Sequence, residues 1–193
     1  MSSLTRQQLE KWLKRIGVND SMVLDIGGAQ NAVRGRTKSW DVRRYDILDL
    51  PKPHEFNFDV DISGDIEDID FKDTKYKGLE YDIAFCLEVS EYWIEPLKAL
   101  RNINKFLKKG GKLYISFHFV YPIHNPEGLD CLRYTRFGIM KLMEKAGFKI
   151  KEIVPRVAER TDMMKFYLNE EMRPNRNYEG RNEVGYLVEA IKI

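Results

Sequence analysis

Hydrophobic residues along this chain alternate between helical spacing and short extended runs. The first helical pattern covers residues 3–17, beginning at the N-cap residue Ser3. Two later segments, 95–107 and 137–146, repeat the pattern. Each of these helices presents an apolar stripe on one face, so we expect all three to pack against a sheet.

Short apolar runs between and after these helices are typical of strands. Strands that alternate with helices along the chain predict an α/β fold, in which a doubly wound sheet carries helices on both faces. The second run ends at Pro51, because proline cannot extend a strand ladder. The expected strands are 23–26, 42–50, 58–62, 81–87, 112–120, 148–154 and 184–193.

Length and composition narrow the class of protein. A chain of 193 residues with 43% hydrophobic content can bury one substantial core, so we expect residues 1–193 to form a single domain. The 32 Lys and Arg residues nearly balance the 30 Asp and Glu residues, which disfavours nucleic acid as the main partner. Cys86 and Cys131 match neither a disulfide framework nor a metal site, and no apolar run is long enough to span a bilayer. We therefore expect a soluble, cytoplasmic protein that holds no metal and does not insert into membranes.

A turn rich in glycine follows the first expected strand. The buried run Val23–Ile26 leads directly into Gly27 and Gly28, where the backbone can pass close to a ligand. In parallel sheets, such turns form nucleotide or nucleoside pockets at the carboxyl ends of the strands. The pyrophosphate of a dinucleotide calls for a third glycine, so the turn argues against a dinucleotide cofactor.

The chain carries five separate motifs, at residues 23–28, 64–69, 81–92, 107–113 and 146–148. In order and spacing they resemble the motifs of the class I S-adenosylmethionine-dependent methyltransferases. The similarity covers residues 21–154. It implies a Rossmann-like fold with a seven-stranded, mainly parallel sheet whose last strand is antiparallel. It also implies transfer of a methyl group from S-adenosylmethionine, with S-adenosylhomocysteine as the product.

The resemblance implies roles for residues of the donor pocket. Asp49, with Asp46 as its rival, would accept hydrogen bonds from the ribose diol, and Asp65 and Ile66 would contact adenine. A purely structural role as a turn residue stays open for Asp49. The other residues that the resemblance assigns to the cofactor are Asp25, Gly27, Gly28, Ala29, Leu87 and Glu88. For Asp25 the structural alternative is to cap the turn by accepting backbone N–H bonds.

The chain departs from the family pattern just after the glycine turn. Ala29 and Asn31 stand where glycine is usual, and the polar, basic segment 34–38 replaces the helix that is expected there.

Candidate catalytic residues follow the fourth and fifth expected strands. Methyl transfer to a hydroxyl requires alignment and a base that takes the proton. Glu91 and Tyr92 follow the fourth strand, although in the family a histidine often stands at the position of Tyr92. His118 and His124 end or follow the fifth strand and titrate near neutrality, but His118 is equally typical of a core residue.

The acceptor-side loop 120–136 is rich in side chains that bind small molecules. Tyr121 and Tyr134 would stack on a ring or a sugar, and Arg133 would bind an anionic acceptor. For Arg133, a role in capping the following helix is an equal alternative.

Three function classes remain. The sequence favours a methyltransferase that acts on a hydroxyl of a small molecule or of a sugar in glycan assembly, as a monomer or a homodimer. A second class is an RNA or protein methyltransferase, and a third is a noncatalytic module that binds the cofactor. The best basic footprint for the second class consists of Arg34, Arg36, Lys38, Arg43 and Arg44.

Overall fold

The computed structural model describes residues 3–52, 57–70, 73, 75, 77–123, 128–158 and 182–193. Its strands are β1 (Gly17–Ile26), β2 (Ser39–Asp49), β3 (Ile62–Ser63), β4 (Tyr81–Cys86), β5 (Leu107–His118), β6 (Phe148–Val157) and β7 (Glu183–Lys192). Its helices are α1 (Leu4–Leu13), α2 (Pro96–Phe106) and α3 (Arg136–Lys145), with a 3-10 turn η2 (Ser90–Tyr92). No described helix is long and apolar enough to cross a bilayer.

The strands form one seven-stranded sheet in the order β3-β2-β1-β4-β5-β7-β6. Strand β7 runs antiparallel to both of its neighbours, and every other pairing is parallel. The predicted α/β fold with an antiparallel last strand is therefore confirmed. In this order the carboxyl ends of β1, β2 and β4 meet at one edge of the sheet, which is where such folds bind ligands.

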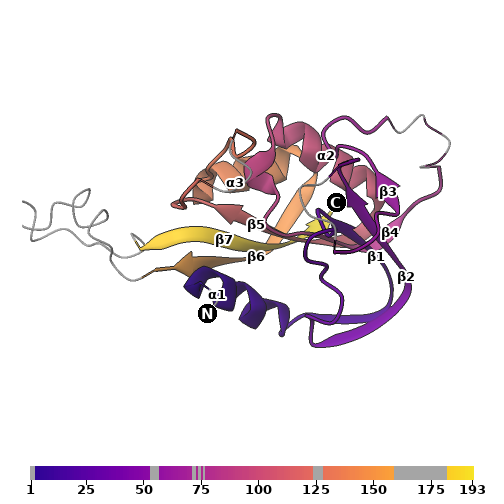
Figure 1. Ribbon diagram of the computed structural model, residues 1–193, viewed down its shortest axis with the longest axis horizontal. Helices are drawn as coiled ribbons and strands as arrows, with labels where there is room; N and C mark the ends of the chain where they lie inside the picture. The colour runs from indigo at the N-terminus through magenta and orange to yellow at the C-terminus, as the bar shows by residue number, and fades with distance from the viewer. Residues whose placement is uncertain are drawn as a thin grey trace, which may run out of the picture.

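Helices cover the two faces unequally (Figure 1). On one face α1 inserts Leu9 and Leu13 into a core with Val23 and Phe85. On the other face α2 and α3 lie together over a larger core. The helical stripes predicted from the sequence are thus the ones that are buried.

The segment between β1 and β2 has no helix, although it is fully described. This agrees with the polar composition of residues 34–38. Several predicted strand boundaries were inaccurate, among them that of β5, which begins at Leu107 and not at residue 112. Strand β1 begins at Gly17, because Gly17 and Val18 already pair with β2 ahead of an irregularity, and β3 is only two residues long.

Strand β6 also continues through Pro155, where the sequence predicted its end. This is possible because β6 is the edge strand of the sheet, so the missing N–H costs no ladder bond.

Candidate active site

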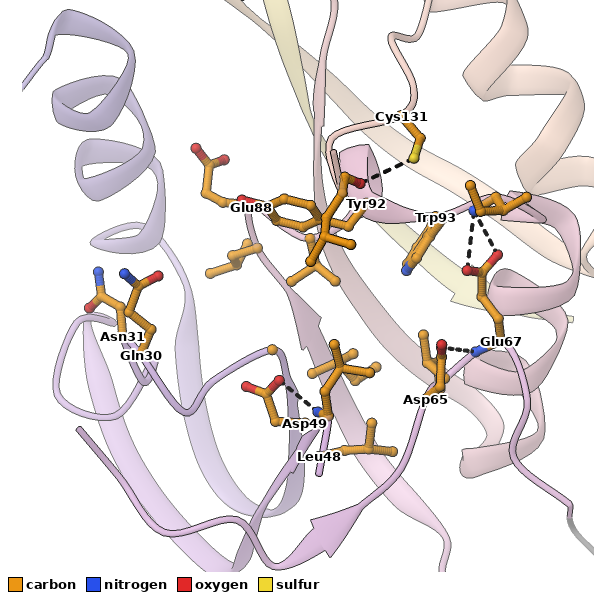
Figure 2. Close-up of a pocket in the computed structure, with 18 of the residues that line it drawn as sticks. Gln30, Asn31, Leu48, Asp49, Asp65, Glu67, Glu88, Tyr92, Trp93 and Cys131 are labelled. Carbon is orange, nitrogen blue, oxygen red and sulfur yellow. Dashed lines mark hydrogen bonds between the residues drawn. The ribbon is translucent and has the colours of Figure 1, made fainter. Parts of the chain in front are cut away.

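A cavity of about 1040 Å³ lies at the carboxyl ends of β1, β2 and β4. Its wall includes Gly27 after β1, Asp49 at the end of β2, residues 64–67 after β3 and residues 87–89 after β4. Figure 2 shows these segments around one hollow, with Tyr92, Trp93 and Cys131 on the side opposite Asp49. The site therefore lies at the edge that the sequence predicted.

The glycine turn is built so that only glycine fits. Gly27 has a φ of +74°, and a Cβ there would lie 2.2 Å from Cγ2 of Val89. A Cβ on Gly28 would lie 2.7 Å from the carboxyl carbon of Asp25. Gly27 itself lines the cavity, so the backbone of the turn can lie close to a ligand there.

Asp25 stabilises the region of this turn through hydrogen bonds. Its Oδ2 accepts the Val33 N–H at 2.7 Å and the Tyr45 hydroxyl at 2.6 Å. Burial raises the pKa of Asp25 to about 6, even though both hydrogen bonds lower it. Asp25, Gly28 and Ala29 are absent from the described cavity wall, and their predicted contact with the cofactor stays a prediction.

We expect Gly27→Ala to destabilise the protein more than Gly35→Ala does. Gly35 has a similar φ of +78°, but nothing lies within 4 Å of its Cβ position. The control therefore measures only left-handed backbone strain, about 1–2 kcal/mol. Gly27→Ala adds crowding against Val89, for a total of about 2–5 kcal/mol. Urea unfolding checks this, and equal losses in the two variants would show that Val89 imposes no steric demand.

Asp49, and not Asp46, faces the cavity. The Asp49 carboxylate accepts the Ala29 N–H at 3.0 Å and the Leu50 N–H at 2.8 Å. Each carboxylate oxygen has the capacity to accept a second hydrogen bond, so Asp49 can also accept from a diol. Asp46 is buried, where its Oδ2 accepts from Arg44 Nε and from the Tyr81 hydroxyl, both at 2.5 Å.

Four other residues that the sequence predicts to bind the methyl donor also line the cavity. Asp65, Ile66, Leu87 and Glu88 are all part of its wall. Asp65 Oδ1 accepts the Glu67 N–H at 2.8 Å, which shapes the turn after β3 (Figure 2).

A buried ionic cluster stands at the wall beside Glu88. Arg156 donates to the two Glu88 carboxylate oxygens at 2.8 and 3.2 Å, and Ser116 donates its hydroxyl at 2.7 Å. His118 Nε2 lies 3.4 Å from Glu88 Oε2 and 3.3 Å from Glu91 Oε1. Arg156, His118 and Glu91 are all buried, and only Glu88 and Arg156 reach the cavity wall.

This cluster shifts the pKa values of its members in opposite directions. Burial alone lowers the pKa of His118, but Glu88 and Glu91 outweigh it and raise that pKa to about 9. Burial alone raises the pKa of Glu88, but His118 and Arg156 outweigh it and hold the pKa well below its ordinary value. At neutral pH His118 is protonated and Glu88 is ionised.

The far end of the cavity is lined by Tyr92, Tyr121, Leu129 and Cys131. The Tyr121 ring lies 4.1 Å from the His118 ring, centroid to centroid. Burial and the nearby Glu91 raise the pKa of Tyr92 well above its ordinary value, so Tyr92 presents a neutral phenol.

The structure places two predicted acceptor residues elsewhere. Tyr134 is buried and donates its hydroxyl to the Ser90 carbonyl at 2.6 Å. Arg133 pairs with Asp130 and donates to the Pro122 carbonyl at 3.1 Å, so it braces the segment that carries Tyr121. His124 lies outside the described residues.

Sequence reasoning missed three arginines in the cavity wall, Arg6, Arg36 and Arg156. For Arg156 the sequence does contain one indication of a special role, because this charged residue stands within an otherwise apolar stretch of β6. Among the described residues, no group of three or more His, Cys, Asp or Glu side chains is arranged to hold a metal ion.

Comparisons with known proteins agree with this geometry. The family described as "Methyltransferase domain" matches residues 1–153. A search of curated proteins gave no match.

Solved structures of methyltransferases share the fold. An S-adenosylmethionine-dependent methyltransferase from Mesorhizobium loti superposes with a TM-score of 0.61 at 14% identity, covering 98% of this chain and 100% of that chain. The N-methyltransferase NodS from Bradyrhizobium japonicum, in complex with S-adenosyl-L-homocysteine, gives 0.60 at 16% identity, covering 97% and 87%. Because the family match spans most of the sequence and the fold agrees with it, the chain belongs to the methyltransferase-domain family, and its resemblance to the class I S-adenosylmethionine-dependent methyltransferases is confirmed.

Proposed function

We propose that this methyltransferase acts on a hydroxyl of a small acceptor, with a sugar hydroxyl in glycan assembly as the favoured class. The observation that supports this is the size and continuity of the cavity. Pockets for one drug-sized ligand measure about 300–1,000 Å³. At about 1040 Å³, this cavity lies at the upper end of that range, so the space beside S-adenosylmethionine suits a small acceptor better than a large one.

The residues of the wall fit the donor. Gly27, Leu87 and Glu88 would contact its methionine moiety, Asp49 its ribose, and Asp65 with Ile66 its adenine. When bound, S-adenosylmethionine supplies a methyl group on a sulfonium, whose thioether is already a good leaving group. The chain's own task is therefore to align the two reactants and to exclude water.

At the acceptor end, Tyr92 and Tyr121 provide aromatic faces and hydroxyl groups suited to a sugar. We assign His118 and Glu91 positioning roles, since both are buried behind the wall and His118 already carries the proton that a base would accept. His118 would orient Glu88 and the ring of Tyr121. Tyr92 is then the candidate from the sequence that would donate a hydrogen bond to the acceptor.

A macromolecular acceptor has less support. Three cations of the basic footprint are paired with carboxylates, Arg36 with Glu10 at 2.7 Å, Arg43 with Asp82 at 2.9 Å and Arg44 with Asp46 at 2.5 Å. Paired cations leave little charge for a phosphate backbone.

We expect Asp49→Ala to weaken S-adenosylhomocysteine binding about 10- to 100-fold, because hydrogen bonds to a charged group contribute about 1.5–3 kcal/mol. Isothermal titration calorimetry measures the affinity. Asp59→Ala is the control, since Asp59 is an exposed carboxylate outside the described cavity wall. Equal affinities for the Asp49 variant and the parent chain would contradict the assignment.

The acceptor class is tested by labelled methyl transfer. The chain is incubated with methyl-labelled S-adenosylmethionine and, separately, with sugars, other small metabolites, RNA and protein. We expect label in a low-mass product and a mass gain of one methyl group. Label that appears only in RNA or protein would contradict the proposal.

A further inference from the structure

Two guanidinium groups meet at one carboxylate beside the glycine turn. Arg6 Nε donates to Glu10 Oε1 at 2.8 Å. Arg36 donates to the same carboxylate through Nη2 at 2.7 Å and through Nε at 3.2 Å. Arg6 and Arg36 both line the cavity, so this cluster places one positive charge more than Glu10 balances at the wall.

The two arginines differ in their spare donors. Arg36 Nη1 donates to the Asn31 carbonyl at 3.0 Å, and this contact fixes the segment that replaces the usual helix after β1. Arg6 Nη1 and Nη2 donate to the side-chain oxygen of Asn31 in the favoured orientation of that amide. A guanidinium has five N–H donors, so the bonds described for Arg6 leave two of them for a ligand.

Arg6 lies where the proposed arrangement of S-adenosylmethionine would place the amino-acid end of that molecule. In Figure 2, Asp49 lies between Asp65 on one side and Gln30 with Asn31 on the other. If adenine lies at Asp65 and the ribose at Asp49, the amino-acid end of the donor extends towards Asn31, the residue that Arg6 contacts.

We infer that Arg6 is the subsite for the α-carboxylate of S-adenosylmethionine, with Glu10 and Arg36 holding its guanidinium in place. A planar guanidinium forms paired, charge-assisted hydrogen bonds with a carboxylate. The segment after the glycine turn has no helix that could anchor the carboxylate. Arg6 would anchor it instead, from α1, outside the glycine motif. This inference rests on the proposed arrangement of the donor.

The test compares two ligands that differ only in that carboxylate. Calorimetry measures S-adenosylmethionine and decarboxylated S-adenosylmethionine against the parent chain and against Arg6→Gln. We expect Arg6→Gln to weaken S-adenosylmethionine about 10- to 100-fold and the decarboxylated analogue less than about threefold. Arg15→Gln is the matched control, because Arg15 is absent from the described cavity wall and pairs with Glu152 at the surface, and we expect it to change neither affinity.

The other outcomes are distinguishable. Equal weakening of both ligands by Arg6→Gln, or no weakening of either, would overturn the carboxylate subsite. Thermal unfolding of Arg6→Gln shows whether an equal loss comes from a disturbed α1. Failure of the parent chain to bind S-adenosylmethionine at all would overturn the donor pocket, and this subsite with it.

Discussion

Replacing Arg156 by methionine is expected to lower the free energy of unfolding by about 3–5 kcal/mol, because breaking a buried ion pair leaves its partner uncompensated. Arg156 is 1% exposed, and its side chain donates to both carboxylate oxygens of Glu88. Methionine fills a similar volume but supplies no donor. Glu88 would then retain only Ser116 and His118 as partners in this cluster.

Urea unfolding at pH 7 measures the loss, and Arg43→Met is the control. Arg43 also pairs with a carboxylate, Asp82, but its side chain is 51% exposed, so we expect a change below about 1 kcal/mol. Glu88→Gln in the Arg156→Met background is expected to recover part of the stability, since it removes the unpaired charge. Losses of similar size for Arg156→Met and Arg43→Met would show that the buried Arg156–Glu88 pair contributes no more to stability than an exposed pair does.

The cluster also explains an unusual backbone at the cavity wall. Glu88 has a φ of +60°, a conformation that residues other than glycine rarely adopt. The Glu88 N–H donates to Ser116 Oγ at 2.7 Å, and the Ser116 hydroxyl donates back to the Glu88 carboxylate. Contacts to β5 and β6 therefore hold a strained residue at the site, as is common where a wall must be preorganised.

How far the sequence predicts this site depends on how local each signal is. The glycine turn, Asp49 and the segment 64–66 lie at strand ends that apolar runs mark directly, so their places in the cavity follow from the order of the strands. Arg156 meets Glu88 across 68 positions of the chain, and Arg36 meets Glu10 across 26. No local pattern contains such pairings, because they depend on sheet order and on how α1 packs.

The same reasoning explains why the surroundings of Tyr134 and His118 differ from those that the sequence indicates. Tyr134 stands in a polar loop segment, which indicates exposure, yet its ring packs edge-on against Phe117 with the ring centroids 4.9 Å apart. His118 ends an apolar strand at the expected edge. Only the structure shows that two carboxylates converge on it, and for this reason we propose a positioning role for His118 in place of the role of a base.

Stability is expected to fall as the pH rises from about 6.5 to 8.5, by about 2 kcal/mol, through the deprotonation of His118. The pKa of His118 is raised to about 9 in the folded chain, above its ordinary value of 6.5. Below pH 6.5 both the folded and unfolded states hold the proton, and the stabilisation is complete. Above 6.5 the unfolded state releases its proton first, so the stabilisation declines until the pH passes about 9.

Urea unfolding across this window, for the parent chain and for His118→Gln, provides the measurement. Two other groups with raised pKa values change the stability outside this pH window. Asp25, with a pKa of about 6, reduces stability as the pH rises from about 4 to 6, and the buried Cys86 thiol acts above the ordinary pKa of a thiol, about 8.5. We therefore expect the slope between pH 6.5 and 8.5 to disappear in His118→Gln, even though the variant is less stable throughout. An equal slope in His118→Gln would show that folding does not raise the pKa of His118, and would return this residue to the candidates for the base.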